Sequence, residues 1–317
     1  MSGRSSATTS LRAGPGTSLQ AACIRCFAVG VVVCRVLGEL EVHTGSGPVD
    51  LGGPLPRRLV CMLLLADGQV VSDERLCHVI WGQRAEPSKA VASLQAYVSR
   101  VRRVLDDRDG WQVQRVGAGY RLLRAAGVTD VDRFVACVHE GRQSLATGRP
   151  AEALPVLDEA LALWRGVPFA DLPDDPQVTA ARARLAELRE VAVEERLAAH
   201  LDAGDAPTAV AELEPAVHDT PFRERRWALL VTGLYRCGRQ QEALAVLRQV
   251  RQLLADELGI DPGPELQQLE RRVLAQDPHL LDMQVILVHL QRVDAGRSGR
   301  EVPVCPGAIC VCVGRGP

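Results

Sequence analysis

The chain has 317 residues, of which 47% are hydrophobic, and its formal net charge is −2. This length fits two folded domains better than one. The cysteines are too scattered for a disulfide-rich secreted protein, and no apolar run beyond the N-terminus is long and uninterrupted enough to cross a membrane.

The N-terminal segment raises the question of a targeting signal. Arg4 and Arg12 precede an apolar run over 21–34, which is the order found in a secretory signal peptide. Arg25 interrupts that run, however, and no convincing small-residue cleavage site follows it. We therefore expect a disordered N-terminal extension over 1–33, no membrane association and a cytoplasmic protein.

Two groups of cysteines are candidates for a metal or redox site. Cys23 and Cys26 have the spacing of half a zinc site or of a redox pair, and the C-terminal tail adds Cys305, Cys310 and Cys312. Both groups lie in terminal tails without a histidine clustered beside them, so we predict no metal and no cofactor. The remaining single cysteines in apolar, helical surroundings are expected to be small buried thiols: Cys61, Cys77, Cys137 and Cys237.

The first compact region begins with partly alternating apolar residues. The run 36–42, VLGELEV, predicts a half-buried strand, and 49–51 is a plausible partner. Pro56 fits the first turn of a buried helix that ends by Asp67-Gly68. Ser72 then predicts the N-cap of a short second helix.

The next predicted helix covers 88–105, with Ser88 as its cap. Its apolar residues recur every three or four positions, so that one stripe of the helix can pack on a core: Val91, Leu94, Val98, Val101 and Leu105. The other side carries cations, hydrogen-bonding side chains and an aromatic ring, which suits a helix lying in a DNA major groove. These residues are Lys89, Ser93, Gln95, Tyr97, Ser99, Arg100, Arg102 and Arg103.

A predicted hairpin follows this helix. The runs 111–116 and 120–123 read as short strands around Gly117-Ala118-Gly119. We expect Tyr120 to be buried, whereas Tyr97 could either contact DNA or pack on the hairpin. The order of strands, three helices and hairpin is that of a winged helix-turn-helix, in which the third helix enters the major groove.

Charge separates the two halves of the chain. Residues 34–124 carry a net charge of +3, concentrated near the helix at 88–105, and 128–282 carry −10. A DNA duplex would favour the basic end.

The composition changes over 124–131, and we expect helix throughout 132–276. Gly148, Gly204 and Gly238 are each followed five residues later by an alanine and then by an aliphatic residue. The last two glycines are 34 residues apart, which is the tetratricopeptide period. Such helix pairs bury their apolar faces only by stacking on one another, and small residues let them stack closely. Gly259 is expected to end one long helix, with the next beginning at Pro264.

Together these motifs resemble the antibiotic regulatory protein (SARP) family of actinobacterial transcription activators. Many short motifs in one order carry the resemblance over roughly 35–281, namely VLGELEV, LGGP, VVSDERL, LQAYVSRVRRVL, GYRLL, VDRF, ALALWRG, CGRQQEAL and LADELGIDPGPEL. The resemblance implies a mainly α protein: an OmpR-type winged helix-turn-helix over 34–124 and an all-α, tetratricopeptide-like bacterial transcriptional activation domain over 128–281. The tail 282–317 stays unassigned.

The resemblance also implies a function. Such a chain would bind direct repeats in double-stranded DNA and recruit RNA polymerase to genes of antibiotic biosynthesis. A homodimer on the DNA is one arrangement consistent with this. Arg100 is the candidate for a base edge, while Lys89, Arg102 and Arg103 suit phosphates. Arg115 and Arg121 are the candidates on the hairpin. Val116 stands where an arginine is common in the family, and the adjacent Arg115 should point to the opposite face of its strand.

Other functions were weighed against this one. The helical repeat alone would suit a protein-interaction scaffold without DNA binding, and the acidic domain could bind a ligand, a partner protein or a second copy of itself. The sequence holds no nucleophile elbow, HExxH motif or Walker-type loop. We therefore predict that the protein is not an enzyme.

Overall fold

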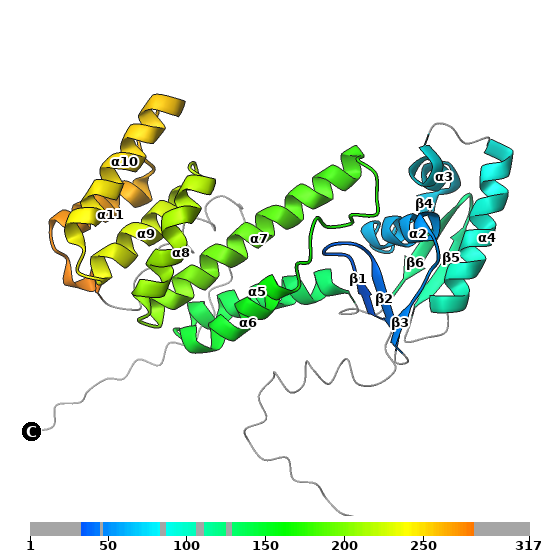
Figure 1. Cartoon of the computed structure of the whole chain (residues 1–317), viewed down its shortest axis with the longest axis horizontal. Helices are drawn as coiled ribbons and strands as arrows, with labels where there is room; N and C mark the ends of the chain where they lie inside the picture. The colour runs from blue at the N-terminus through cyan, green and yellow to red at the C-terminus, as the bar shows by residue number, and fades with distance from the viewer. Residues whose placement is uncertain (1–32, 45–46, 83–86, 106–110, 125–128, 282–317) are drawn as a thin grey trace, which may run out of the picture. The chain divides into compact units, whose positions relative to one another are not determined.

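The computed structural model describes residues 33–44, 47–82, 87–105, 111–124 and 129–281 (Figure 1). Contacts divide the chain into two compact units. The first contains the described residues up to Ala136 together with Glu159–Arg189, and the second contains Cys137–Asp158 and the described residues from Glu190 onward. Both terminal cysteine groups and the predicted extension over 1–33, except Val33, which lies in a strand, are outside the described residues.

The first unit begins with an antiparallel sheet of order β1-β2-β3, formed by Val33–Arg35, Glu41–Thr44 and Gly47–Val49. The predicted single strand over 36–42 is therefore wrong in its bounds. Residues 36–39 form a bend instead of a strand, and within it the neighbours Val36 and Leu37 are both buried. Gly38 has a φ of 153°, which suits a residue without Cβ.

The winged-helix order is confirmed. Helices α2, α3 and α4 lie together with a second antiparallel sheet of order β4-β6-β5 (Figure 1). Their bounds are Pro54–Leu65 for α2, Asp73–Trp81 for α3, Pro87–Leu105 for α4, Val71–Ser72 for β4, Gln112–Val116 for β5 and Gly119–Leu123 for β6. The two-residue strand β4 was not predicted.

The ends of these helices follow local chemistry. The side chain of Ser72 accepts a hydrogen bond from the Arg75 amide, which confirms the predicted N-cap of α3. Helix α2 begins at Pro54, where the missing amide hydrogen leaves nothing unpaired. Helix α4 begins at Pro87, so Ser88 is inside the helix and the prediction that it caps α4 was wrong.

The first unit also contains a segment that we predicted as helix. Residues 163–175, between α6 (Pro150–Ala162) and α7 (Pro176–Asp202), are not helical. Instead, the backbone amides of Arg165, Phe169 and Ala170 donate to the carbonyls of Leu37, Val36 and Gly38 at 2.8, 2.7 and 3.2 Å. This segment therefore takes up the backbone groups of the 36–39 bend, a long-range pairing that local periodicity does not indicate.

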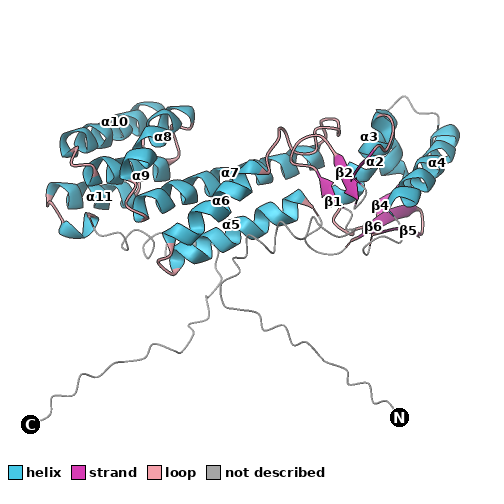
Figure 2. Ribbon diagram, turned by 60° about the horizontal axis from the view of Figure 1, so that its bottom comes forward, coloured by secondary structure: helices cyan, strands magenta, loops and turns pink. Residues whose placement is uncertain are grey.

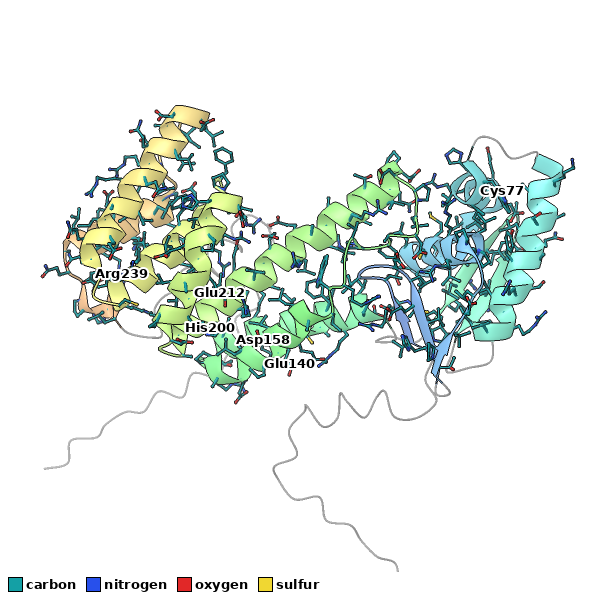
Figure 3. All side chains as sticks on the ribbon, in the orientation of Figure 1. Cys77, Glu140, Asp158, His200, Glu212 and Arg239 are labelled. Carbon is teal, nitrogen blue, oxygen red and sulfur yellow. The ribbon has the colours of Figure 1, made fainter. Side chains whose placement is uncertain are left out.

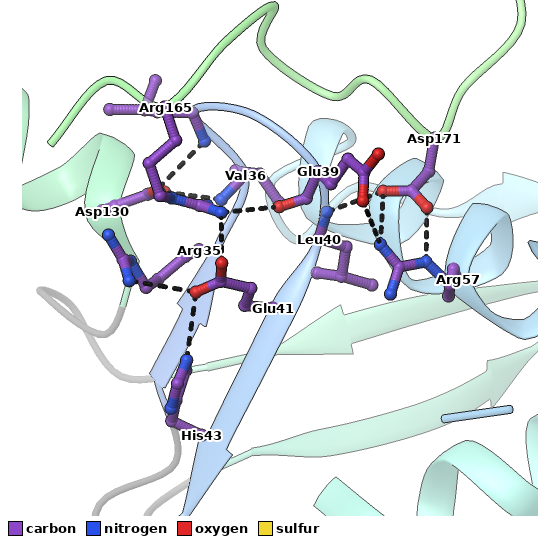
Figure 4. Close-up of polar contacts among 11 residues, drawn as sticks. Arg35, Val36, Glu39, Leu40, Glu41, His43, Arg57, Asp130, Arg165 and Asp171 are labelled. Atoms are coloured by element: carbon purple, nitrogen blue, oxygen red, sulfur yellow. Dashed lines mark hydrogen bonds and ion pairs between the residues drawn. The ribbon is translucent and has the colours of Figure 1, made fainter. Parts of the chain in front are cut away.

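A buried carboxylate completes that junction. Asp130 is 4% exposed, and its two oxygens accept the amides of Val36 and Leu37 at 2.8 and 2.9 Å (Figure 4). The guanidinium of Arg165 lies beside it and bonds Glu41 at 2.7 Å. Burial raises the pKa of Asp130, and the two backbone amides oppose that rise.

The second unit is helical, and the repeat predicted from glycine spacing is confirmed (Figure 2). Gly148, Gly204 and Gly238 all have φ between 69° and 84°, and each lies in the turn between two helices. The alanines five residues later are Ala153, Ala209 and Ala243, and all are fully buried. The remaining helices are α5 (Asp130–Ala146), α8 (Ala206–Asp219), α9 (Glu224–Arg236), α10 (Gln240–Leu258) and α11 (Pro264–Leu274), with a short 3-10 turn η2 at Pro278–Leu280.

Arginines link the helices of this unit. Arg196 on α7 pairs with Asp158 of α6 at 3.4 Å and also with Glu212 of α8, and both carboxylates are labelled in Figure 3. Gly259 ends α10 at a φ of 68°, and α11 begins at Pro264, as predicted. No helix among the described residues combines the length and apolarity of a membrane span.

Candidate nucleic-acid interface

Helix α4 is anchored by one apolar face. Its buried residues pack against α2, α3 and β5, and they are Ala90, Leu94, Val98, Val101 and Leu105. The predicted stripe is thus confirmed except at Val91, which is only half-buried, whereas the neighbouring Ala90 is buried. The opposite face of α4 is left for solvent or a ligand.

Four side chains on the open face make no hydrogen bond or ion pair with any described residue. Gln95, Arg100 and Arg103 are exposed, and Ser93 is half-exposed. Lys89, one turn before Ser93, is also exposed. These groups supply two fixed positive charges, a further cation at Lys89, and amide and hydroxyl groups that suit phosphates and base edges.

The position of Arg100 depends on a glycine that the sequence did not single out. A Cβ placed on Gly52 would lie 2.7 Å from the guanidinium carbon of Arg100. The guanidinium therefore lies directly against the backbone before α2. In the sequence, only the membership of Gly52 in the LGGP motif indicated that this glycine matters.

Two predicted contact residues of α4 have partners inside the protein. The ring of Tyr97 stacks on Trp81 of α3 with centroids 5.8 Å apart, so of the two alternatives left open for Tyr97, packing on the hairpin is not what the structure shows. Ser99 Oγ donates to the carbonyl of Gln95 at 2.9 Å. The Tyr97 ring therefore joins α4 to α3, whereas the Ser99 hydrogen bond lies within α4 itself.

Arg102 joins α4 to the hairpin. Its Nε donates to the carbonyl of Val113 on β5 at 3.0 Å. Because this bond sets the helix relative to the wing, Arg102 has a structural role that the sequence did not indicate.

Arg115 and Arg121 lie on opposite faces of the wing. In the β5–β6 ladder Arg115 pairs with Tyr120 and Gln114 pairs with Arg121. Tyr120 is 4% exposed, which confirms it as a core residue. Arg115 therefore shares a face with the core, as expected from its offset by one residue from Val116.

The guanidinium of Arg115 is occupied. It donates to both carboxylate oxygens of Asp73 at 2.8 and 2.7 Å and lies 4.6 Å from the ring centroid of Tyr120. The hydrogen bonds with Asp73 raise the pKa of Arg115. This arrangement ties the wing to the start of α3.

Arg121 belongs to a polar ladder on the other face of the wing. Its Nε and Nη2 donate to Gln114 Oε1 at 3.0 and 2.7 Å, and Gln114 in turn donates to Gln112 at 2.6 Å. The wing can approach β4 only because residue 119 is glycine, since a Cβ there would lie 2.4 Å from the Val71 carbonyl oxygen.

The single cysteines offer no reactive site of the kind that functional thiols require. Cys61 and Cys137 are buried as predicted, while Cys77, labelled in Figure 3, and Cys237 are only partly buried. Burial raises the pKa of Cys61 well above that of an ordinary thiol, which keeps it protonated and inert. Within the described ranges, no group of histidine, cysteine and carboxylate side chains is arranged to hold a metal ion.

Comparison with known proteins places both halves of the chain. Residues 51–122 match the family described as "Transcriptional regulatory protein, C terminal", and 129–274 match "Bacterial transcriptional activator domain". The regulatory protein AfsR of Streptomyces coelicolor is 39% identical over 80% of this chain, and the match covers 25% of AfsR. The chain thus spans about a quarter of the length of that relative.

Two further comparisons cover more of the other protein. The transcriptional regulator RedD of Streptomyces coelicolor is 34% identical, over 79% of this chain and 73% of RedD. The solved structure "Mycobacterium tuberculosis EmbR in complex with low affinity phosphopeptide" has a TM-score of 0.69 and 31% identity, over 85% of this chain and 72% of that one. By name, AfsR is a regulatory protein, and RedD and EmbR are regulators of transcription. The chain therefore belongs to the antibiotic regulatory protein (SARP) family of transcriptional activators.

Proposed function

We propose that this protein is a sequence-specific DNA-binding activator of secondary-metabolite biosynthesis genes. The observation that supports this most strongly is the open face of α4, where the side chains of Arg100, Arg103, Gln95 and Ser93 make no hydrogen bond or ion pair with described residues. A helix so exposed, next to a hairpin wing, has the form of a major-groove reader. Family membership supports the same conclusion.

Each candidate residue has a proposed part in binding. Arg100 would grip a guanine edge with two hydrogen bonds, and Gln95 and Ser93 would meet neighbouring bases. Arg103 and Lys89 would contact phosphates. Tyr97, Arg102 and Arg115 would contribute mainly by holding α4 and the wing, since each has a partner on another element. Ser99, which is exposed and bonds only to its own helix, would add a hydroxyl to the contact face.

The wing would contribute through Arg121, whose ladder with Gln114 and Gln112 keeps it extended along the strand face that is not buried. The chain would bind direct repeats and recruit RNA polymerase, and two copies on adjacent repeats would form a homodimer on the DNA. Such activity implies a cytoplasmic protein, because that is where a bacterial chromosome lies, and it assigns no residue to catalysis.

The experiment that tests this proposal compares Arg100→Ala, Arg103→Ala and the wild type. The probes are a duplex enriched by the wild-type protein from a random-sequence library and a shuffled duplex of equal composition. We expect Arg100→Ala to lose about 1–3 kcal/mol of preference for the enriched duplex. Arg103→Ala should weaken binding to both duplexes by the same factor. It should also reduce by about one the slope of the logarithm of affinity against the logarithm of salt concentration.

Arg248→Ala is the matched control, because Arg248 is exposed on α10 of the second unit. It should leave both affinities unchanged, and circular dichroism should show the same helicity in all variants. Failure of the wild type to enrich any sequence would contradict DNA recognition and favour a protein-interaction scaffold.

A further inference from the structure

The 163–175 segment is hydrogen-bonded to α2, one of the two helices on which α4 packs. Asp171, whose side chain is 9% exposed, accepts hydrogen bonds from Arg57 Nε at 2.5 Å and Arg57 Nη2 at 3.2 Å (Figure 4). The same carboxylate accepts the amide of Leu40 at 2.6 Å. A single buried side chain therefore ties α2 to the bend that precedes β2.

These hydrogen bonds continue from α2 to the end of α3. Arg58 Nε donates to the backbone carbonyl of Asp171 at 3.3 Å, and Arg58 Nη1 donates to the carbonyl of Ile80 at 3.0 Å. Ile80 lies in the last turn of α3, where carbonyls lack a helical partner. Arg58 thus joins the segment, α2 and α3 in one chain of hydrogen bonds.

A second carboxylate holds α3 directly. Asp175 pairs with Arg75 through two parallel hydrogen bonds, one of 2.8 Å from Nη1 and a shorter one from Nη2. Its side chain is 12% exposed, and it also accepts the amide of Gln177 at 3.0 Å, at the start of α7. The hydrogen bonds from Arg75 lower the pKa of Asp175, so the pair stays charged at neutral pH.

Neither carboxylate forms a hydrogen bond or ion pair with a described residue of α4, but α4 packs on the two helices that they hold. Leu94, Val98 and Val101 of α4 are buried in the packing with α2 and α3. We propose that Asp171 and Asp175 are positioning residues for DNA recognition, which set the placement of α2 and α3 and thereby aim α4 at base edges. This inference rests on the proposed DNA-binding function.

A positioning role differs measurably from a merely stabilising one. Two-bond recognition of a base edge depends on side-chain placement to within a fraction of an ångström, whereas phosphate contacts are more tolerant. A small shift of α4 should therefore weaken binding to the preferred sequence and leave non-specific binding nearly unchanged. Loss of stability alone would lower the amount of folded protein and weaken both kinds of binding equally.

The test uses full-length Asp171→Asn and Asp175→Asn at a temperature at which circular dichroism shows each protein fully folded. The probes are the enriched and the shuffled duplex described above, at one fixed salt concentration. We expect the preference for the enriched duplex, measured as its dissociation constant relative to that of the shuffled duplex, to weaken about tenfold. The affinity of each variant for the shuffled duplex should stay within about twofold of the wild-type value.

Asp174→Asn is the matched control. Asp174 lies in the same segment, but its side chain is 92% exposed and it pairs with Arg182, at 2.8 Å. It should bind both duplexes like the wild type. If Asp175→Asn does not fold, Arg75→Lys replaces it, because lysine keeps the charge and cannot form the two parallel hydrogen bonds.

A double-mutant cycle of Arg75→Gln and Asp175→Asn completes the test. The double variant should lose no more discrimination than either single one, since one pair is broken in each case. Unchanged discrimination in both Asp variants, or equal weakening on both duplexes, would overturn the positioning role while leaving DNA binding intact. If the wild type enriches no sequence, the proposed function itself fails, and this inference fails with it.

Discussion

At the scale of single residues, the contact between Gly52 and Arg100 makes a sharp prediction. Gly52→Ala should push the Arg100 guanidinium away, because the new Cβ would lie 2.7 Å from its carbon. Because the backbone at this position has a φ of 88°, an alanine here should also destabilise the fold by about 1–2 kcal/mol. We expect a loss of preference for the enriched duplex like that of Arg100→Ala, measured by competition binding.

Gly68→Ala is the control for this substitution. Gly68 has a φ of 80°, but no atom lies within 4 Å of the position of its Cβ. It should show the same loss of stability with unchanged DNA preference. Equal DNA preference in the two variants would mean that Arg100 does not depend on Gly52.

The residues of the candidate interface were predictable to the extent that they follow helical periodicity. The exposure of Gln95, Arg100 and Arg103 follows from their place opposite the apolar stripe. The partners of Arg102 and Arg115 could not be predicted in the same way. These partners depend on where the wing lies against α3 and α4, and that placement is set by tertiary packing and not by local sequence.

Asp202 makes a second prediction at this scale, on pH and stability. Its side chain is 5% exposed, 3.6 Å from Arg236, and burial raises its pKa to about 6. The folded protein therefore keeps this proton where the unfolded chain has lost it. The resulting stabilisation is complete at low pH and disappears as pH rises through about 6.

Asp202→Asn should remove this pH dependence. Between about pH 4 and pH 7 the wild type should lose roughly 1–3 kcal/mol of unfolding free energy relative to the variant. Urea unfolding at several pH values checks the difference, which cancels the contributions of all other groups. A constant difference across that range would show that Asp202 titrates normally.

At the scale of elements, the repeat glycines and alanines explain how the helices of the second unit pack. Ala243 on α10 is fully buried, whereas Ala245 on the same helix is exposed. Ala243→Leu should therefore destabilise the protein by about 1–3 kcal/mol through overpacking. Ala245→Leu adds the same side chain and should change stability by less than about 0.5 kcal/mol, as measured by thermal unfolding. Similar effects of the two changes would contradict close helix stacking at Ala243.

Elements with strong local signals were predicted, and those made by distant partners were not. Helix α3 was found from its Ser72 cap, and α10 from Gly259 at its end. Strand β4 has two residues and exists because β6 lies beside it. The 163–175 segment is not helical, and three of its amides pair instead with the 36–39 bend, more than a hundred residues earlier in the chain.

At the scale of the whole molecule, the division into compact units differs from the predicted domains. The boundary proposed at 124–128 follows a change in composition, yet Thr129–Ala136 and Glu159–Arg189 belong to the first unit by their contacts. Composition records what each stretch of chain is made of. It does not record which stretch supplies a buried carboxylate such as Asp130 to the bend at Val36 and Leu37.

This division predicts that a fragment of residues 34–124 is less stable than the same region in the intact protein. The fragment lacks Asp130, so the amides of Val36 and Leu37 lose their acceptors, and each unpaired buried group costs about 1–3 kcal/mol. It also leaves Arg57 and Arg75 without Asp171 and Asp175.

Because a small domain has a total stability of only about 5–15 kcal/mol, these losses should bring the fragment close to unfolding at room temperature. Urea unfolding followed by tryptophan fluorescence compares the fragment with the intact chain and with full-length Asp130→Asn. The variant should fall between the two, since an asparagine retains one acceptor oxygen for the two amides. A fragment that unfolds at the same urea concentration as the intact protein would show that the winged helix folds without the segments that follow it.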